Sequence, residues 1–458
     1  MGFNIVSESV TPVVPAAPSM LQKTGAIISQ GGTTITPGTL QLITQASDLT
    51  SLTPTPLAVT SAAWAASVVT LTLTSATTWP VGTTLEITVA GFTPTGYNGT
   101  FLGTVATTTT ITYPLAVSPG TETVAGTVMP AEVANIANLV SQFYAQGAGL
   151  SFYIYETGVT AIATAITALQ TWLTNNPSAV YLWLVPSTWD AQAGYLTLVE
   201  LYTAATAKTY FITTTTVSNY TQYPVTAKSV LAMVNAPTAP ATETRSAVSI
   251  FWQVLNNNPG AGGQVPPLNN RFAYALTPWT GLGIQTTLTA ILAANVNVLL
   301  TGAEGGLSNI IIRGGRTMDG KPFGYWYAVD WVEINGGRAI AAEVINGSNT
   351  SLNPLVYNQL GINQLQSTLV GVMQQAISAG LALGNIVTTQ LSQIDFVNNF
   401  NNGLYAGQVV INAVPFAAYQ LLNPTSYSIG QYGGLSVVFA PQLGFDSILV
   451  NITPTEIA

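Results

Sequence analysis

The chain is poor in charged residues, and this scarcity constrains its fold and function more than any other feature. Only 6% of its 458 residues are Asp, Glu, Lys or Arg, whereas an ordinary soluble domain carries about 25%. A free monomer of this composition has few charges with which to keep its surface hydrated. We therefore expect much of that surface to be covered by other protein, as in a subunit of a large assembly.

The chain contains no His and no Cys, and these absences remove several kinds of chemistry. A Ser-His-Asp or Cys-His nucleophile, a Cys/His zinc site and a disulfide cannot be built without imidazole or thiol. Carboxylate-only mechanisms, Lys bases and oxygen-ligated metal sites remain. Drift in a Thr-, Ala- and Asn-rich composition would explain the same absences. We expect a protein that is not an enzyme, with no catalytic residues and no bound cofactor or metal.

Charge and hydropathy also bear on partners and location. A formal net charge of -8 and a pI near 4.4 argue against a nucleic-acid partner, because phosphate binding needs clustered Lys and Arg. The first ten residues contain an acid and no base, unlike a signal peptide, and no run reaches about 18 apolar residues. We expect synthesis in a cytoplasm and no direct membrane insertion.

Residues 1–22 are expected to form an extended N-terminal arm, followed by the start of the main fold over residues 23–58. Pro12, Pro15 and Pro18 exclude a helix there. The arm is nevertheless more apolar than a disordered terminus usually is. The residues that we expect to contact another subunit are Ile5, Val6, Val10, Val13 and Val14.

Residues 59–128 are expected to form a small antiparallel β domain inserted into the main fold. Val69, Leu71 and Leu73 alternate with threonines, which is the period of a half-buried strand. Gly- and Pro-rich turns separate such segments.

Residues 129–325 are expected to form an α/β domain. Apolar strands at 150–156, 180–185 and 209–213 alternate with helical patterns at 162–173 and 195–205, which predicts a parallel sheet covered on both faces. The remaining predictions for this domain are a short helix over Ser229–Val234, a strand over Val248–Val254, a helix near 288–294 and strands over 296–300 and 309–313. No G-x-G-x-x-G follows the first strand, and no Walker A motif occurs.

Residues 326–445 are expected to form an α+β C-terminal domain. The aromatic run Tyr325–Val332 predicts a strand, followed by helices over 339–345 and 357–383 and strands over 405–411 and 435–439. On such a strand Asp330 and Glu333 would point to opposite faces, which disfavours a proton-sharing pair. The run Asp395–Gly403 lacks calcium-loop spacing and predicts a turn.

Residues 446–458 are expected to form a C-terminal arm strand after a Gly-Phe-Asp hinge. A terminal strand of this kind suits addition to the sheet of another subunit. Its apolar residues are Ile448, Leu449, Val450 and Ile452. The alternative for both arms is an ordinary edge strand within one subunit.

Arg313, Arg316 and Lys321 form the only local cluster of basic residues in the sequence. They would either contact an acidic partner or a neighbouring subunit, or belong to a solvated turn.

The order of these parts resembles that of contractile phage tail sheath proteins. The strand and GGRT-x-DG turn over Arg313–Gly320 carry the resemblance, and Val10–Pro15 and Lys23–Ser29 look like the start of the smaller family members. The run Pro94–Phe101 resembles a β module scattered through phage virion proteins. Arg338 follows Asn-Gly-Gly here, which departs from the family's pattern after the aromatic segment.

This resemblance implies a structural machine. Sheath subunits stack as rings around a tail tube, exchange terminal arms, and contract to drive the tube through the host envelope. The implied partners are other copies of the chain, the tail tube protein, and baseplate and tail terminator proteins, all in the contractile tail of a virion. Another virion or cell-surface structural protein, such as a tube, capsid or adhesin subunit, remains an alternative. A carbohydrate-active or carboxylate-based enzyme is a third.

Overall fold

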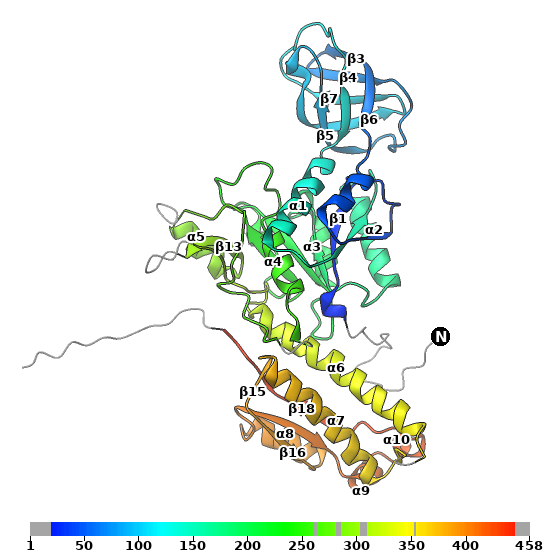
Figure 1. Ribbon diagram of the computed structural model, residues 1–458, viewed down its shortest axis with the longest axis vertical. Helices are drawn as coiled ribbons and strands as arrows, with labels where there is room; N and C mark the ends of the chain where they lie inside the picture. Colours follow the sequence, from blue (N-terminus) through cyan, green and yellow to red (C-terminus); the bar gives the residue numbers. More distant parts are fainter. Residues whose placement is uncertain (1–19, 260–262, 281–284, 303–308, 352–353, 445–458) are drawn as a thin grey trace, which may run out of the picture.

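The computed structural model of the chain describes residues 20–259, 263–280, 285–302, 309–351 and 354–444. Three bodies follow one another along its longest axis (Figure 1): a β-barrel, an α/β domain and a C-terminal domain. The mixed multidomain architecture expected from the sequence is confirmed, with a mainly parallel sheet, a small antiparallel β domain and a C-terminal α+β part. The segments predicted to form arms, 1–19 and 445–458, lie outside the described residues.

The α/β domain is built on an eight-stranded sheet with the order β14-β13-β12-β11-β10-β1-β9-β2. In that order, the strands from β13 through β9 are parallel to one another, whereas the edge strands β14 and β2 run antiparallel to their neighbours. The strands are β1 (Gly25–Ser29), β2 (Leu40–Ile43), β9 (Phe152–Glu156), β10 (Leu182–Leu184), β11 (Tyr210–Thr215), β12 (Val230–Val234), β13 (Asn297–Gly302) and β14 (Asn309–Arg313).

Helices cover both faces of this sheet because its central strands are apolar on both sides. On β1, Ile27 faces the core made by α1 (Glu132–Gln146) and α4 (Val248–Leu255). Ile28 faces the opposite core, which α2 (Ile162–Asn175), α3 (Ala193–Glu200) and α5 (Gln285–Ala293) complete.

The barrel is a closed antiparallel sheet with the strand order β3-β4-β7-β6-β5-β8. Alternate residues such as Val69 and Leu71 are buried inside it, as their period-2 pattern predicts. Its strands are β3 (Leu57–Ala65), β4 (Val68–Leu73), β5 (Thr84–Ala90), β6 (Gly99–Thr107), β7 (Thr110–Pro114) and β8 (Thr127–Pro130). Its first and last strands pair at Leu57 and Val128, so the chain enters and leaves the barrel at one place.

The C-terminal domain begins on the long helix α6 (Phe323–Ser348), which also contacts the α/β domain. Helix α7 (Gln359–Ser378) packs against α6 and on the sheet β16-β17-β18. The other elements are β15 (Ala382–Leu383), β16 (Asn385–Thr389), α8 (Gln393–Asn401), β17 (Gln408–Ala413), α9 (Phe416–Leu422), α10 (Pro424–Ser428), β18 (Leu435–Val438) and β19 (Ala440–Pro441).

Two predictions in the α/β domain are wrong in type. Residues Val248–Val254 form helix α4 rather than a strand, because all eight residues of α4 are buried and the helix therefore has no polar face to reveal its period. Residues Ser229–Val234 contribute strand β12 rather than a helix. This short run is buried on both sides between β11 and β13.

Two predictions in the C-terminal part are also wrong. The aromatic run Tyr325–Val332 lies within α6, because its rings pack as one side of a helix against the α/β core, overriding their strand preference. Asp330 and Glu333 therefore both face the α/β domain. The run Asp395–Gly403 is largely helix α8, whose start the Ser392 side chain caps by accepting from the Asp395 N–H.

Candidate functional site

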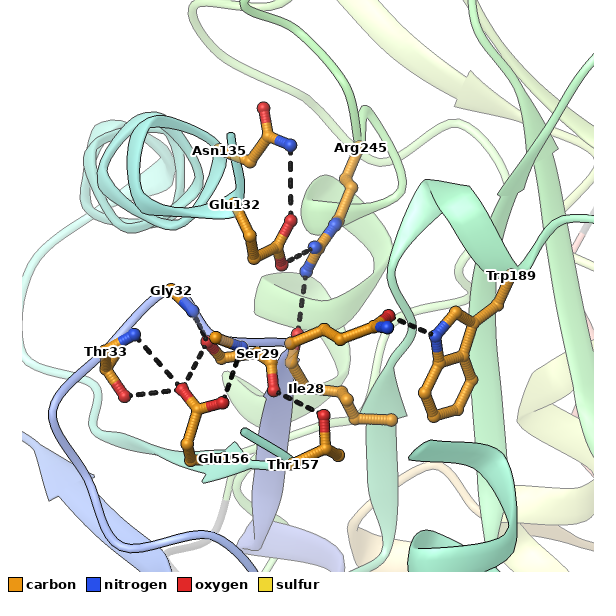
Figure 2. Close-up of polar contacts among 12 residues, drawn as sticks. Ile28, Ser29, Gly32, Thr33, Glu132, Asn135, Glu156, Thr157, Trp189 and Arg245 are labelled. Carbon is orange, nitrogen blue, oxygen red and sulfur yellow. Dashed lines mark hydrogen bonds and ion pairs between the residues drawn. The ribbon is translucent and has the colours of Figure 1, made fainter. Parts of the chain in front are cut away.

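The carboxyl edge of the parallel strands is where an α/β sheet ordinarily binds a ligand. The strand order reverses around β1, which lies between β9 and β10, and this reversal places the expected crevice at the carboxyl ends of these strands. Figure 2 shows this region. Three side-chain groups from the chain itself fill it.

The first group surrounds Glu156, the last residue of β9, which is fully buried. Its Oε1 accepts from the backbone N–H groups of Gly31 and Gly158, each at 2.7 Å. Its Oε2 accepts from the Ser29 hydroxyl at 2.7 Å and from the Thr33 hydroxyl and N–H at 2.7 and 3.1 Å. Burial raises the pKa of Glu156, whereas these hydrogen bonds act in the opposite direction.

The second group is a buried ion pair between Arg245 and Glu132. The guanidinium also donates to the Ile28 carbonyl at 3.2 Å, and Asn135 donates to the other oxygen of Glu132 at 3.2 Å. This pair therefore connects β1, the start of α1 and the segment before α4 (Figure 2).

The third group is Gln30, which follows β1 directly. Its side-chain oxygen accepts from the Trp189 indole N–H at 3.0 Å, and its amide nitrogen donates to the Thr160 carbonyl at 2.6 Å. Together the three groups occupy the crevice with neutralised or hydrogen-bonded side chains. They leave a structural framework where an α/β enzyme would place its substrate.

This framework also fixes the barrel to the α/β domain, and we call it the barrel joint. Val159, in the loop that Glu156 helps to hold, packs on the hydrophobic core of the barrel. Gly31 approaches Val159 so closely that a Cβ atom at position 31 would lie 2.6 Å from it, and its φ of +79° also favours glycine.

A second polar cluster lies at the opposite, amino edge of the sheet, where α6 packs; we call it the C-terminal joint. Asp330 on α6 is fully buried, and its Oδ2 accepts from the hydroxyls of Tyr181 and Tyr210, both at 2.8 Å. Its Oδ1 has no hydrogen-bond partner among the described residues. Burial raises the pKa of Asp330 to about 6, although nearby Lys228 and the two tyrosines oppose that rise.

Two lysines accompany this carboxylate. The Lys228 ammonium donates to the Ala205 carbonyl at 2.7 Å and lies 4.4 Å from the centre of a Trp326 ring. Burial lowers the pKa of Lys228. The Lys208 ammonium pairs with Glu333 at 2.8 Å, one turn beyond Asp330 on α6. The C-terminal joint thus contains several charged groups that are largely shielded from water.

The surface of the C-terminal domain is unusually apolar. Half of the large hydrophobic side chains that are exposed among the described residues lie between Ile345 and Leu443, about a fifth of the chain. On α8, Ile394, Val397 and Phe400 recur every three residues and are all exposed. Burying such surface against protein would be favourable by about 25 cal/mol per Å².

The three-stranded sheet of this domain has open edges. Within the described part of the chain, β16 and β18 each pair only with β17. The unpaired main-chain groups of an edge strand can accept another strand.

Of the predicted site residues, the structure describes only the three basic ones. Ile5, Val6, Val10, Val13 and Val14, and Ile448, Leu449, Val450 and Ile452, lie outside the described residues. Arg313 ends β14 and donates to the Asn270 side chain at 3.2 Å, whereas Arg316 donates to the Gly320 carbonyl at 3.2 Å. The exposed Lys321 ammonium lies 4.4 Å from the centre of the Tyr325 ring. These contacts order the turn itself.

Sequence reasoning missed both joints, although it had one usable signal. Glu156 ends the apolar run Phe152–Glu156, and Asp330 lies within an aromatic segment. A rare acid in an apolar run must find partners when it is buried.

The side chains of the run PTGYNGT hold the barrel loops in place. The Tyr97 hydroxyl donates to the Gly120 carbonyl, and the Asn98 side chain bonds both backbone groups of Phe92.

Among the described residues, no helix is both long and apolar enough to cross a membrane. Nor do three or more Asp or Glu side chains converge there as a metal site would require.

No protein-family model and no curated protein matches the sequence. Among solved structures, the chain is similar to a sheath tail protein from Listeria innocua, with a TM-score of 0.41 and 9% sequence identity. The similarity covers 78% of this chain and 85% of that one.

Proposed function

We propose that this chain is a structural subunit of a contractile phage tail sheath, which polymerises around a tail tube and contracts to drive it through a host envelope. The observation that carries the proposal is the exposed apolar surface of the C-terminal domain, next to a sheet with open edges. In an isolated monomer that surface would be a liability. In a lattice of identical subunits it becomes the interface.

Two further observations support a structural role. The expected ligand crevice of the α/β domain is filled by Glu156, Gln30 and the Arg245–Glu132 pair. The order of parts and the turn over Arg313–Gly320 resemble those of sheath proteins. The proposed partners are other copies, the tail tube protein, and baseplate and tail terminator proteins, and the proposed location is the virion tail.

The terminal segments are proposed to join subunits. Residues 446–458 would add a strand to an open edge of the β16-β17-β18 sheet in a neighbouring copy, and the N-terminal residues would contact a further copy. Each main-chain hydrogen bond contributes only about 0.5 to 1.5 kcal/mol. Repetition around a cylinder would make the sum large.

Truncation after Phe445 tests this proposal. We expect a folded, cooperatively melting protein that forms no striated cylinders in negative-stain images, whereas the full chain forms them. A matched control, truncation after Ile452, keeps the apolar residues and should still assemble. Normal cylinders from the shorter chain would refute the C-terminal arm.

Negative-stain images of the full chain test the proposed sheath role separately from the C-terminal arm. Striated hollow cylinders support a sheath. Smooth tubes, closed shells or isolated particles at all concentrations and ionic strengths would instead favour the alternative of another virion or surface structural protein.

A further inference from the structure

Helix α6 contributes to two domains, and Asp330 lies in the half of the helix that packs on the α/β domain. The first half of α6 buries Phe323 and Tyr327 in the α/β core. Its second half packs against α7, where Gln364 donates to Glu343 at 2.5 Å. The angle between the α/β and C-terminal domains therefore depends on how firmly the first half of α6 is seated (Figure 1).

The carboxylate of Asp330 can take up a proton without losing a donor. Its two partners, Tyr181 and Tyr210, are hydroxyls bound to one oxygen, and the other oxygen has no partner among the described residues. Glu156 at the barrel joint differs, because both of its oxygens accept from backbone N–H groups that cannot rotate away. A proton on Glu156 would displace a donor.

Other ionisable groups face this site from every element that packs there. On α6 itself these are Tyr327 and Glu333, and on the preceding turn Asp319. The α/β domain contributes Tyr181, Tyr210, Lys208, Lys228 and, beyond Tyr327, Arg271. The two lysines favour the ionised form of Asp330, whereas burial opposes it.

We propose that the C-terminal joint is proton-sensitive: protonation of Asp330 seats α6 more firmly on the amino edge of the α/β sheet. The ionised side chain buries a negative charge, and one of its oxygens has no donor among the described residues, which costs free energy. A proton neutralises that charge and leaves both tyrosine hydrogen bonds possible. This device concerns one subunit and does not depend on the proposed role in a sheath.

The direction of the effect follows from linkage. The pKa of Asp330 is raised to about 6 in the folded joint, from an ordinary value of 3.8. The closed joint therefore binds a proton more tightly than the opened joint. Stability of the joint is gained as pH falls from neutral, and the gain is complete below the ordinary pKa. Between pH 7 and about pH 5 the closing equilibrium should strengthen about tenfold.

Hydrogen–deuterium exchange on the full-length, unassembled protein measures this equilibrium. We expect the amides of residues 326–334 to exchange about tenfold more slowly at pH 5 than at pH 7, after correction for the intrinsic pH dependence of exchange. The Asp330→Asn variant should lose this pH dependence. The Glu156→Gln variant is the matched control at the other joint and should keep it.

A second variant keeps the test decisive if Asp330→Asn fails to fold. Tyr181→Phe removes one donor from the ionised carboxylate, so the pH midpoint for protection of α6 should move upward. Persistence of the tenfold change in Asp330→Asn, its absence in the natural chain, or an unmoved midpoint in Tyr181→Phe would overturn the proposal.

Discussion

The two joints of the α/β domain differ in how their buried charged groups are paired and hydrogen-bonded. At the barrel joint, Glu156 accepts five hydrogen bonds and Arg245 is paired with Glu132. At the C-terminal joint, Asp330 accepts only two from the described residues, both through one oxygen, and its neighbours Lys208 and Lys228 bind other groups. The first arrangement stabilises one geometry, whereas the second leaves a charge whose cost depends on pH.

This difference shows that burial alone does not determine what a rare charged residue does. Glu156 and Asp330 are equally inaccessible to water. Their donors differ: backbone N–H groups of a folded loop surround the first, and tyrosine hydroxyls at one side contact the second. We expect the barrel joint to be rigid and the C-terminal joint to respond to protons.

The largest expected effect is on the buried ion pair. Arg245→Leu should lower the free energy of unfolding of the α/β domain by about 3 to 5 kcal/mol, because it leaves Glu132 buried without its cation. Denaturant unfolding followed by tryptophan fluorescence measures the loss. The control, Arg338→Leu, replaces an exposed arginine of α6 and should change stability by less than about 0.5 kcal/mol. Equal effects of the two variants would mean that the pair is not essential to the joint.

A smaller loss is expected for Glu156→Gln. The amide NH2 group of Gln would replace one of the two carboxylate oxygens. It would then face either the N–H groups of Gly31 and Gly158 or that of Thr33, so at least one buried donor loses its acceptor. The cost should be about 1 to 3 kcal/mol near neutral pH. Glu86→Gln, at an exposed position on β5, is the control for removing one negative charge. A neutral result for Glu156→Gln would contradict the rigid description of the barrel joint.

The smallest effect on stability is expected where charges are not buried. Replacing Arg313, Arg316 and Lys321 together by Gln should cost less than about 1 kcal/mol. In the proposed sheath, the same variant should bind tail tubes more weakly, and most clearly at low salt, because exposed charges are screened beyond about 10 Å at 0.1 M. Co-sedimentation with tubes at two ionic strengths measures this. Unchanged binding at low salt would exclude a docking role for the cluster.

Sequence patterns predicted elements that have one face exposed to solvent. Strand β4 of the barrel alternates strictly, helix α2 repeats its apolar residues every three or four positions, and α7 is found close to its predicted range. Helix α4 and strand β12 are buried on every side, so neither has a readable period, and each was assigned the wrong type. Strands β10 and β11 are also buried throughout, yet their short apolar runs were correctly predicted as strands.

The joints could not be predicted because their partners are distant along the chain. Tyr181 is 149 residues from Asp330, and Arg245 is 113 residues from Glu132. The sequence showed only that each acid lies in or beside an apolar run and would need partners. It contained no information on whether those partners would be fixed N–H groups or rotatable hydroxyls.

The sequence by itself determined the low charge of this chain, the absence of imidazole and thiol chemistry, and the strand period of the barrel, since composition and local periodicity depend on neighbouring residues alone. Only the tertiary structure decided that the aromatic run around Asp330 is a helix. It also decided that one oxygen of this carboxylate has no hydrogen-bond partner among the described residues, whereas both oxygens of Glu156 have partners. The reason is physical. Burial and hydrogen-bond satisfaction depend on which segments meet in space, and these meetings join residues more than a hundred positions apart.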